Sequence, residues 1–272
     1  MKYAEGEVSV NRIKIHYYRT GLGKTPFVLL HGATDNGLCW TPVAEWLSEN
    51  YDVIMPDAQG HGKSDRLTPG FKFSDHAWQI AGLINQLNLK KPLIMGHSMG
   101  AGTAVNIAVS YPDLPKAIIL EDPAWREPVD PSRETHDTIR QRQEMLKTMA
   151  GFAQMSRDEL MAEGRKSNPK WSESELKPWV ESKSQFDPNL FKNLVFDGPT
   201  YKEQVPFIKC PTLLITSESG IVEPAAANLA QQLWKSTYPF RCVKIMGAGH
   251  NIRREQFAEF KNSVTKFLES LG

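Results

Sequence analysis

The chain has 272 residues, of which 40% are hydrophobic and 23% charged, proportions typical of one large globular domain or of one domain with an insertion. Its 32 basic and 31 acidic residues leave a formal net charge of +1. This balance excludes the strongly basic surface of proteins that bind nucleic acid or anionic membranes, so we expect neither as a partner.

The start of the chain and its cysteines indicate the cellular setting. Residues 1–10 contain no apolar core of a secretory signal, and no apolar run reaches the length of a membrane span. Cys39, Cys210 and Cys242 lie far apart without the spacing of metal ligands, and we expect all three to be buried thiols. The sequence therefore predicts a cytoplasmic protein, although a mature exported form would show the same features.

An alternating segment and then a series of apolar runs predict the strands. Residues 7–19 alternate around Asn11 and Arg12, which indicates an N-terminal β-hairpin. The later runs are continuously apolar, as is typical of strands that are buried on both faces of a parallel sheet. These runs cover residues 26–32, 51–57, 92–98, 116–122, 211–217 and 241–247.

Helical patterns separate most of these runs. They cover residues 75–89, with Ser74 as a candidate N-cap, and residues 100–112, 224–236 and 256–271. Alternating strands and helices predict an α/β fold with a doubly wound, mostly parallel sheet.

One segment, residues 123–204, interrupts the alternation because it contains no run typical of a strand. Ser156 with Glu159, and Ser172 with Glu175, match the capping box in which a hydroxyl and a carboxylate satisfy each other's backbone amides. We expect about four short helices that form a cap over the carboxyl edge of the sheet. Residues 1–122 and 205–272 would then form the core.

Several large side chains are candidates for the substrate pocket. Trp125, Trp179 and Phe186 can either pack the cap onto the core or line a pocket beneath it, and both roles can hold for different residues. His31 and Ile221 follow two of the predicted strands and complete the candidate pocket. Such a lining would suit a mid-sized apolar or aromatic acyl or lactone substrate.

The strongest motif is Gly96-His97-Ser98-Met99-Gly100, which ends one apolar run and opens a helical pattern. This context is what a nucleophile elbow of the form G-x-S-x-G requires. The turn is tight, so small residues must flank a serine that is held in strained geometry with its hydroxyl exposed. The helix that begins there offers backbone amides and the positive end of its dipole. We predict that Ser98 is the nucleophile.

Two loops after earlier strands support this site. His31-Gly32-Ala33 follows a strand and can turn a backbone amide toward Ser98, so we assign the oxyanion hole to the amides of Ala33 and Met99. The loop that begins at Asp57 contains His61 between two glycines. We interpret both of its polar residues as structural, because the shape of the loop explains them without chemistry.

His250 is the predicted general base. It lies in the glycine-rich segment 247–251, after the last strand and before the last helix. A loop of this kind can bring the imidazole to the serine, where it would take the hydroxyl proton and later return it to the leaving group.

Together, the segments HGAT, DAQGHGKS, GHSMG and GAGHN resemble the α/β-hydrolase family in both order and spacing, over nearly the whole chain. The resemblance implies an eight-stranded, mostly parallel sheet, a helical cap and a Ser–acid–His triad in that order along the chain. It also excludes the dehalogenase and epoxide hydrolase branches, which need a carboxylate nucleophile where this chain has Ser98.

The triad acid departs from the common family pattern. Most relatives have an aspartate in the turn after the strand at 211–217, where this chain has Ser219 or Gly220. In several family branches, including some haloalkane dehalogenases and the zearalenone lactone hydrolases, the acid instead follows the preceding strand, which here matches Asp122. Glu121 would point to the opposite face because side chains alternate along a strand. We predict Asp122 as the acid, with Glu121 and Glu218 as alternatives.

The residues and the resemblance together predict a serine hydrolase that cleaves carboxylic esters or lactones through an acyl-enzyme. C–C bond hydrolysis, perhydrolysis (haloperoxidase activity) and acyl transfer can run on the same triad, and a ligand receptor with a retained triad is a further alternative. We expect a small-molecule substrate, no cofactor, no metal, and a monomer or homodimer.

Overall fold

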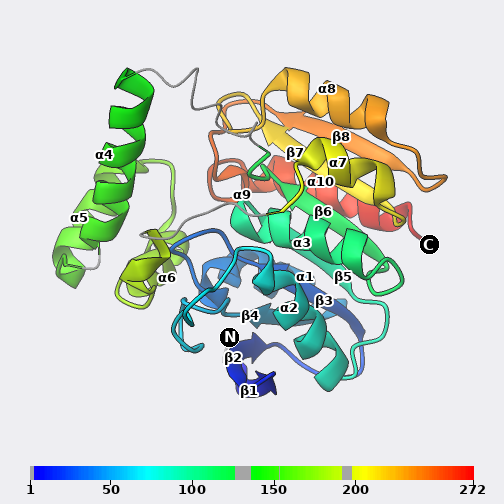
Figure 1. Cartoon of the computed structure of the whole chain (residues 1–272), viewed down its shortest axis with the longest axis horizontal. Helices are drawn as coiled ribbons and strands as arrows, with labels where there is room; N and C mark the ends of the chain where they lie inside the picture. Colours follow the sequence, from blue (N-terminus) through cyan, green and yellow to red (C-terminus); the bar gives the residue numbers. More distant parts are fainter. Residues whose placement is uncertain (1–2, 126–135, 153, 192–197) are drawn as a thin grey trace.

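The computed structural model describes residues 3–125, 136–152, 154–191 and 198–272. In this part of the chain, eight strands form one sheet in the order β1-β2-β4-β3-β5-β6-β7-β8. All strands from β3 onward pair in parallel, whereas β2 pairs antiparallel with β1 and with β4. The eight-stranded, mostly parallel α/β sheet is confirmed (Figure 1).

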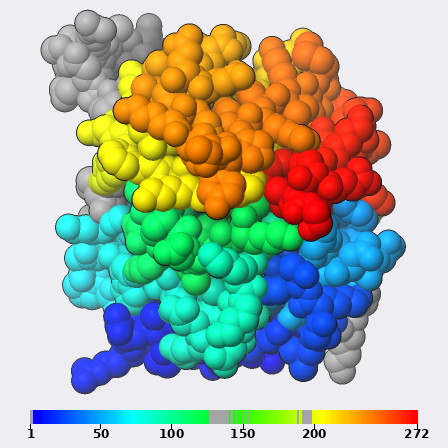
Figure 2. Space-filling view, turned by 90° about the vertical axis from the view of Figure 1, so that its right-hand side faces the viewer, coloured from blue at the N-terminus to red at the C-terminus, as the bar shows by residue number. Residues whose placement is uncertain are grey.

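The strands match the predicted runs to within two residues at each end, except that β1 begins three residues earlier than predicted. They are β1 (Ala4–Val10), β2 (Ile13–Arg19), β3 (Thr25–Leu30), β4 (Tyr51–Pro56), β5 (Leu93–His97), β6 (Ala117–Glu121), β7 (Thr212–Ser217) and β8 (Phe240–Ile245). Asn11 and Arg12 form the β1–β2 turn with φ of +48° and +68°. In the space-filling view the N-terminal hairpin and α8 lie at opposite ends of the molecule, as the strand order requires (Figure 2).

Two layers of helices cover the sheet because its strands are apolar on both faces. Val28 and Leu30 belong to one core cluster, whereas Phe27 and Leu29 belong to the other. The first cluster packs under α2 (Asp75–Gln86), α3 (Met99–Ser110), α7 (Tyr201–Gln204) and α8 (Pro224–Leu233). The second packs under α1 (Thr41–Leu47), α9 (Ile252–Glu255) and α10 (Phe257–Glu269). Short 3-10 helices η1 (Gly37–Trp40) and η3 (Val205–Phe207) complete the core.

The segment predicted as a cap contains helices in its described residues. These are α4 (His136–Phe152), α5 (Arg157–Ser167), α6 (Glu173–Lys183), the 3-10 helix η2 (Pro188–Phe191) and, at the end of the segment, α7, which packs on the core. Leu160, Leu176 and Trp179 form a small core of their own between α5 and α6. Figure 1 shows α4 and α5 beside the sheet, with α6 between them and α1. The core and cap boundaries at 122/123 and 204/205 stay a prediction.

Three local predictions need correction or qualification. Ser156 and Glu159 form the predicted capping box, but Ser172 and Glu175 do not, because Glu175 turns into the protein to meet an arginine. Helix α2 begins after Ser74 as predicted, yet the Ser74 side chain makes no capping bond to the helix.

The cysteine prediction is right for two of the three thiols. Cys39 and Cys210 are buried, whereas Cys242 is exposed because it lies on β8, the strand at the edge of the sheet. None of the helices in the described residues combines the length and the apolar character that a membrane span needs.

Candidate active site

Ser98 lies in a strained turn between β5 and α3. Its backbone has φ +51° and ψ −110°, a conformation that residues with a side chain rarely adopt, and the residue is partly exposed. A Cβ atom added to Gly96 would meet the Gly100 carbonyl oxygen at 2.2 Å. One added to Gly100 would meet the Leu30 carbonyl oxygen at 2.1 Å. The turn therefore requires the small residues that the motif supplies.

The loop after β3 lies directly against this turn. A Cβ atom added to Gly32 would come within 2.7 Å of His97 Nδ1 and 3.6 Å of Ser98 Cβ, so the next residue, Ala33, lies near the nucleophile. Met99 is the first residue of α3, and its amide is one of the four that have no acceptor within the helix. The two amides predicted for the oxyanion hole thus belong to segments that meet at Ser98.

His31 fixes the start of this loop. Its Nδ1 donates to the Gly32 carbonyl oxygen at 2.8 Å, and its Nε2 accepts from the Ala58 amide at 3.0 Å. Burial lowers the pKa of His31, which agrees with a neutral ring that donates at one nitrogen and accepts at the other. His31 is buried and holds backbone on both sides, as expected of a structural residue.

His250 and Asp122 meet at the carboxyl edge of the sheet. His250 Nδ1 lies 2.6 Å from Asp122 Oδ2, and the His250 side chain is 31% exposed while that of Asp122 is fully buried. The carboxylate also accepts the amides of Ile221 at 2.8 Å and Val222 at 3.1 Å. The Asp122 carboxylate thus accepts from three donors. It therefore takes the Nδ1 proton of His250 as a hydrogen bond and leaves Nε2 as the acceptor.

The other two candidate acids are bonded elsewhere. Glu121 is buried on the opposite face of β6, where it accepts the Arg253 amide at 2.8 Å and the Arg253 guanidinium at 2.9 Å. Glu218 accepts the Gly247 amide at 3.1 Å. Of the three carboxylates that the sequence left open, the structure brings Asp122 to His250. Its catalytic role stays a prediction.

Gly220 leaves the space that the carboxylate of Asp122, directly after β6, occupies. A Cβ atom added at this position would lie 2.6 Å from both carboxylate oxygens of Asp122. A side chain at 220 and a carboxylate at 122 therefore cannot occupy the same space. The sequence shows Ser219 or Gly220 in place of the family's usual aspartate, but it gives no sign that Gly220 makes room for Asp122.

His97 is a further residue of the site that sequence reasoning did not single out. Its Nε2 donates to the His250 carbonyl oxygen at 3.0 Å, and the two imidazole rings lie 4.6 Å apart. Burial, together with the charge of Arg253, brings the pKa of His97 well below its usual value. A neutral His97 thus supports the backbone of the residue predicted as the base. Its place inside G-x-S-x-G gives no signal of this contact.

Asp57 and His61 shape their loop, as predicted. Asp57 accepts the amides of Gly37 at 2.7 Å and Lys63 at 3.0 Å, and it binds the His16 ring at 2.9 Å. The ring of His61 is buried beside His31, and burial holds its pKa well below the usual value. Neither side chain contacts His250 or Ser98 in the described bonds.

The predicted pocket residues are mostly buried in protein contacts. Trp125 stacks on Tyr201 with the ring centroids 5.1 Å apart, and Trp179 packs edge-on against Trp171. Phe186 is 2% exposed. Ile221 is partly exposed, and its amide holds Asp122. Whether these side chains also line a substrate pocket stays a prediction.

Comparison with known proteins adds a family and three enzymes. The family model described as alpha/beta hydrolase fold matches residues 25–253. The chain is 36% identical over 116 residues to 2-(acetamidomethylene)succinate hydrolase of Mesorhizobium japonicum, a match that spans 42% of this chain and 41% of that relative. It is 28% identical over 211 residues to (E)-2-((N-methylformamido)methylene)succinate hydrolase of Acinetobacter baylyi, which spans 77% of each.

The third relative covers almost the whole chain. This is the 2-hydroxy-6-oxononadienedioate/2-hydroxy-6-oxononatrienedioate hydrolase of Burkholderia vietnamiensis, 26% identical over 285 residues, or 98% of this chain and 95% of the relative. Among solved structures, that of E-2-(acetamidomethylene)succinate hydrolase matches with a TM-score of 0.78 at 21% identity, over 98% of this chain and 100% of the other. At that identity the likeness shows a shared fold.

Proposed function

The chain belongs to the α/β-hydrolase family, and we propose that it is a hydrolase with Ser98 as nucleophile, His250 as general base and acid, and Asp122 as the orienting acid. The observation that carries the proposal is the 2.6 Å contact of His250 with a fully buried carboxylate that accepts two further hydrogen bonds, in a chain whose Ser98 has φ +51°. Strain of this kind at a lone serine is what a nucleophile elbow uses to expose its hydroxyl.

The charges at the site support the proton transfers that this role needs. Asp122 fixes the tautomer in which Nε2 of His250 accepts, and its charge stabilises the imidazolium that forms when the serine attacks. The amides of Ala33 and Met99 would receive the oxyanion, with each donor contributing about 3–4 kcal/mol to the transition state. His97 would keep the His250 backbone in place through its carbonyl oxygen.

The bond that is cleaved is a separate question from the triad. Sequence reasoning favoured an ester or lactone, but no relative reported above is named for one. The named substrate of the full-length relative has a ketone at carbon 6 and carboxylates at both ends, and it contains no ester or amide. Water can split such a molecule only at a carbon–carbon bond. We therefore propose C–C bond hydrolysis of a small carboxylated ketone ahead of ester or lactone cleavage.

The triad can carry out this reaction with balanced atoms. Ser98 Oγ attacks the ketone carbon while His250 takes the hydroxyl proton, and the carbonyl oxygen becomes the oxyanion. Collapse of the oxyanion breaks the bond between the carbonyl carbon and the neighbouring carbon. The electron pair passes to that carbon, which takes the proton from His250. Water, deprotonated by His250, then attacks the acyl-Ser98 and releases a carboxylic acid.

A second candidate is hydrolysis of an amide in a small dicarboxylate. It is favoured by the matches to two relatives whose named substrates carry an acetamido or N-methylformamido group on a succinate. The same acyl-enzyme would form, with nitrogen instead of carbon as the leaving atom.

Three substrates distinguish these reactions: 2-hydroxy-6-oxonona-2,4-dienedioate, 2-(acetamidomethylene)succinate and p-nitrophenyl butyrate. We expect the wild type to have its highest kcat/KM on the dienedioate, with two carboxylic acid products by mass spectrometry, and Ser98→Ala to lose this turnover. A preference for the succinate would support the amide reaction, and a preference for the butyrate would restore the ester prediction. Activity of Ser98→Ala near the wild-type level would refute the triad.

A further inference from the structure

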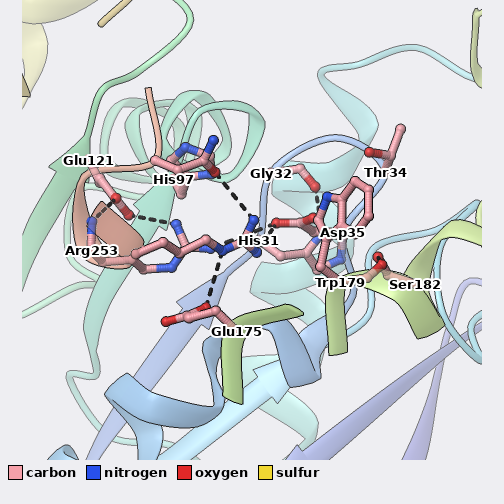
Figure 3. Close-up of polar contacts among 12 residues, drawn as sticks. His31, Gly32, Thr34, Asp35, His97, Glu121, Glu175, Trp179, Ser182 and Arg253 are labelled. Atoms are coloured by element: carbon pink, nitrogen blue, oxygen red, sulfur yellow. Dashed lines mark hydrogen bonds and ion pairs between the residues drawn. The ribbon is translucent and has the colours of Figure 1, made fainter. Parts of the chain in front are cut away.

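A cluster of buried charged residues lies between helix α6 and the core, next to the site (Figure 3). Its members are at most 5% exposed and comprise Asp35, Glu121, Glu175, Lys183, Arg253 and Arg254. The three acidic and three basic side chains balance in charge. Each core member neighbours a residue of the proposed mechanism, since Asp35 follows Ala33 by two positions, Glu121 precedes Asp122, and the arginines follow His250 by three and four.

The ammonium group of Lys183 directs all its hydrogen bonds to one loop. Its ammonium donates to the carbonyl oxygen and to the hydroxyl of Thr34, both at 2.9 Å, and to Asp35 Oδ1 at 3.2 Å. An ammonium group has three donors, so all three hold the loop of residues 31–35, here called the oxyanion loop. Thr34 has φ +64°, a strained conformation for a β-branched residue. Lys183 thus binds the loop at Thr34, its strained residue.

Asp35 continues this contact toward the base. Its Oδ2 accepts from Arg254 at 2.7 Å, and Arg254 lies in α9, which follows His250 directly. Burial alone would raise the pKa of Asp35, but Arg254 and Lys183 bring it well below its usual range. Asp35 is therefore ionised and joins the oxyanion loop to the His250 segment.

Helix α6 carries two members of the charged cluster on one face, with a tryptophan between them. Glu175, Trp179 and Lys183 are spaced four residues apart, so they lie one above the other along the helix. Glu175 pairs with Arg254 at 3.2 Å, and the Lys183 ammonium lies 4.9 Å from the Trp179 ring centroid. Helix α6 thus reaches both the oxyanion loop and α9.

We propose that Lys183 is a positioning residue that sets the oxyanion loop, and with it the Ala33 amide, when α6 is seated on the core. The inference rests on the proposed function, because it assigns the Ala33 amide to the oxyanion. Burying an ammonium is costly, and a well-packed apolar side chain often stabilises a protein as well or better. Lys183 nevertheless directs its three donors to Thr34 and Asp35, the residues that follow Ala33.

The test compares Lys183→Met with Lys177→Met, the same change at an exposed lysine of α6. The substrate is whichever of the three above the wild type hydrolyses, and 2,2,2-trifluoroacetophenone serves as a probe because its adduct with a serine is an oxyanion. We expect Lys183→Met to lower kcat by 10- to 1,000-fold. KM should change less than threefold, and the Ki of the ketone should rise in parallel with the loss of kcat. Lys177→Met should match the wild type.

A structural role alone would lower the melting temperature and the active fraction, without changing kcat per folded site or the Ki. A folded Lys183→Met with unchanged kcat and Ki would overturn the proposal. If Lys183→Met does not fold, Thr34→Val and Thr34→Ser decide, because both leave the buried charge paired and only the first removes the hydroxyl. Loss of kcat in Thr34→Val alone supports the proposal, and equal rates overturn it. Failure of the proposed function is distinguished by Ser98→Ala, which would then retain activity.

Discussion

Replacing Asp122 with asparagine is the sharpest test of the triad. Both oxygens of the Asp122 carboxylate act as acceptors. Oδ2 accepts from His250 and from the Ile221 amide, and Oδ1 accepts from the Val222 amide, so neither can be replaced by a donor without losing a hydrogen bond. An amide nitrogen at Oδ2 would oppose the Ile221 N–H and force the proton of His250 onto Nε2. An amide nitrogen at Oδ1 would oppose the Val222 N–H. Either orientation sets two donors against each other, and both remove the negative charge.

The loss can be estimated from these contacts. The missing charge, joined by the wrong tautomer when the nitrogen lies at Oδ2, predicts a fall in kcat of about 10⁴-fold, or roughly 5 kcal/mol of transition-state stabilisation. Losing one amide bond to a charged acceptor predicts a loss of stability of about 1.5–3 kcal/mol. The variant should therefore fold with a melting temperature several degrees lower and be nearly inactive.

The assay measures kcat for Asp122→Asn beside Glu218→Gln, which keeps an oxygen acceptor for the Gly247 amide. Active-site titration with a fluorophosphonate corrects for the fraction of folded enzyme. We expect Glu218→Gln to stay within threefold of the wild type. A folded Asp122→Asn with more than a tenth of the wild-type kcat would refute the assignment of Asp122. A low kcat in Glu218→Gln alone would instead assign the role of the acid to Glu218.

Three further predictions follow from strain and burial. Gly220→Ala should lower kcat at least tenfold, because the new Cβ would lie 2.6 Å from the Asp122 carboxylate oxygens. Gly21→Ala, where the new Cβ has open space, is the control and should leave kcat unchanged. Equal kcat values for the two variants would contradict the steric argument. Ser98→Gly should abolish turnover yet raise the free energy of unfolding by about 1 kcal/mol in urea melts, because glycine adopts φ +51° without strain; a drop in stability would refute the strain argument. Burial lowers the pKa of His76 to about 4, so the unfolded chain takes up this proton first as the pH falls from about 6.5. Stability should thus drop with acid, by about 2 kcal/mol between pH 7 and pH 5 from this side chain, and His76→Gln should flatten that slope.

The part of the site that local patterns encode could be predicted from the sequence. Apolar runs gave the strands, and a serine between glycines at a strand–helix junction gave the elbow, because both signals lie within a few residues. Asp122 is predicted from the resemblance to family branches with the acid after this strand, and its 2.6 Å contact with His250 agrees with that position, because the carboxyl ends of parallel strands meet at one edge of the sheet.

The buried charge cluster could not be predicted in this way. Asp35 meets Lys183 and Arg254 across 148 and 219 positions, and no local pattern pairs them. Glu175 even gave a misleading local signal, since Ser172 three residues earlier completes the pattern of a capping box. Glu175 pairs with Arg254 instead of capping α6, because leaving a buried guanidinium without a counter-charge costs more free energy than leaving an exposed helix end uncapped.

The position of the acid is one coupled feature of two loops. The turn after β7 lacks the aspartate of the common family pattern, yet it supplies the Ile221 and Val222 amides that hold Asp122. Gly220 in the same turn leaves the space that the Asp122 carboxylate fills. A side chain at position 220 and a carboxylate at position 122 therefore compete for the same space. The turn after β7 thus serves Asp122 in two ways, because it provides both the amides that bind the carboxylate and the space that the carboxylate fills.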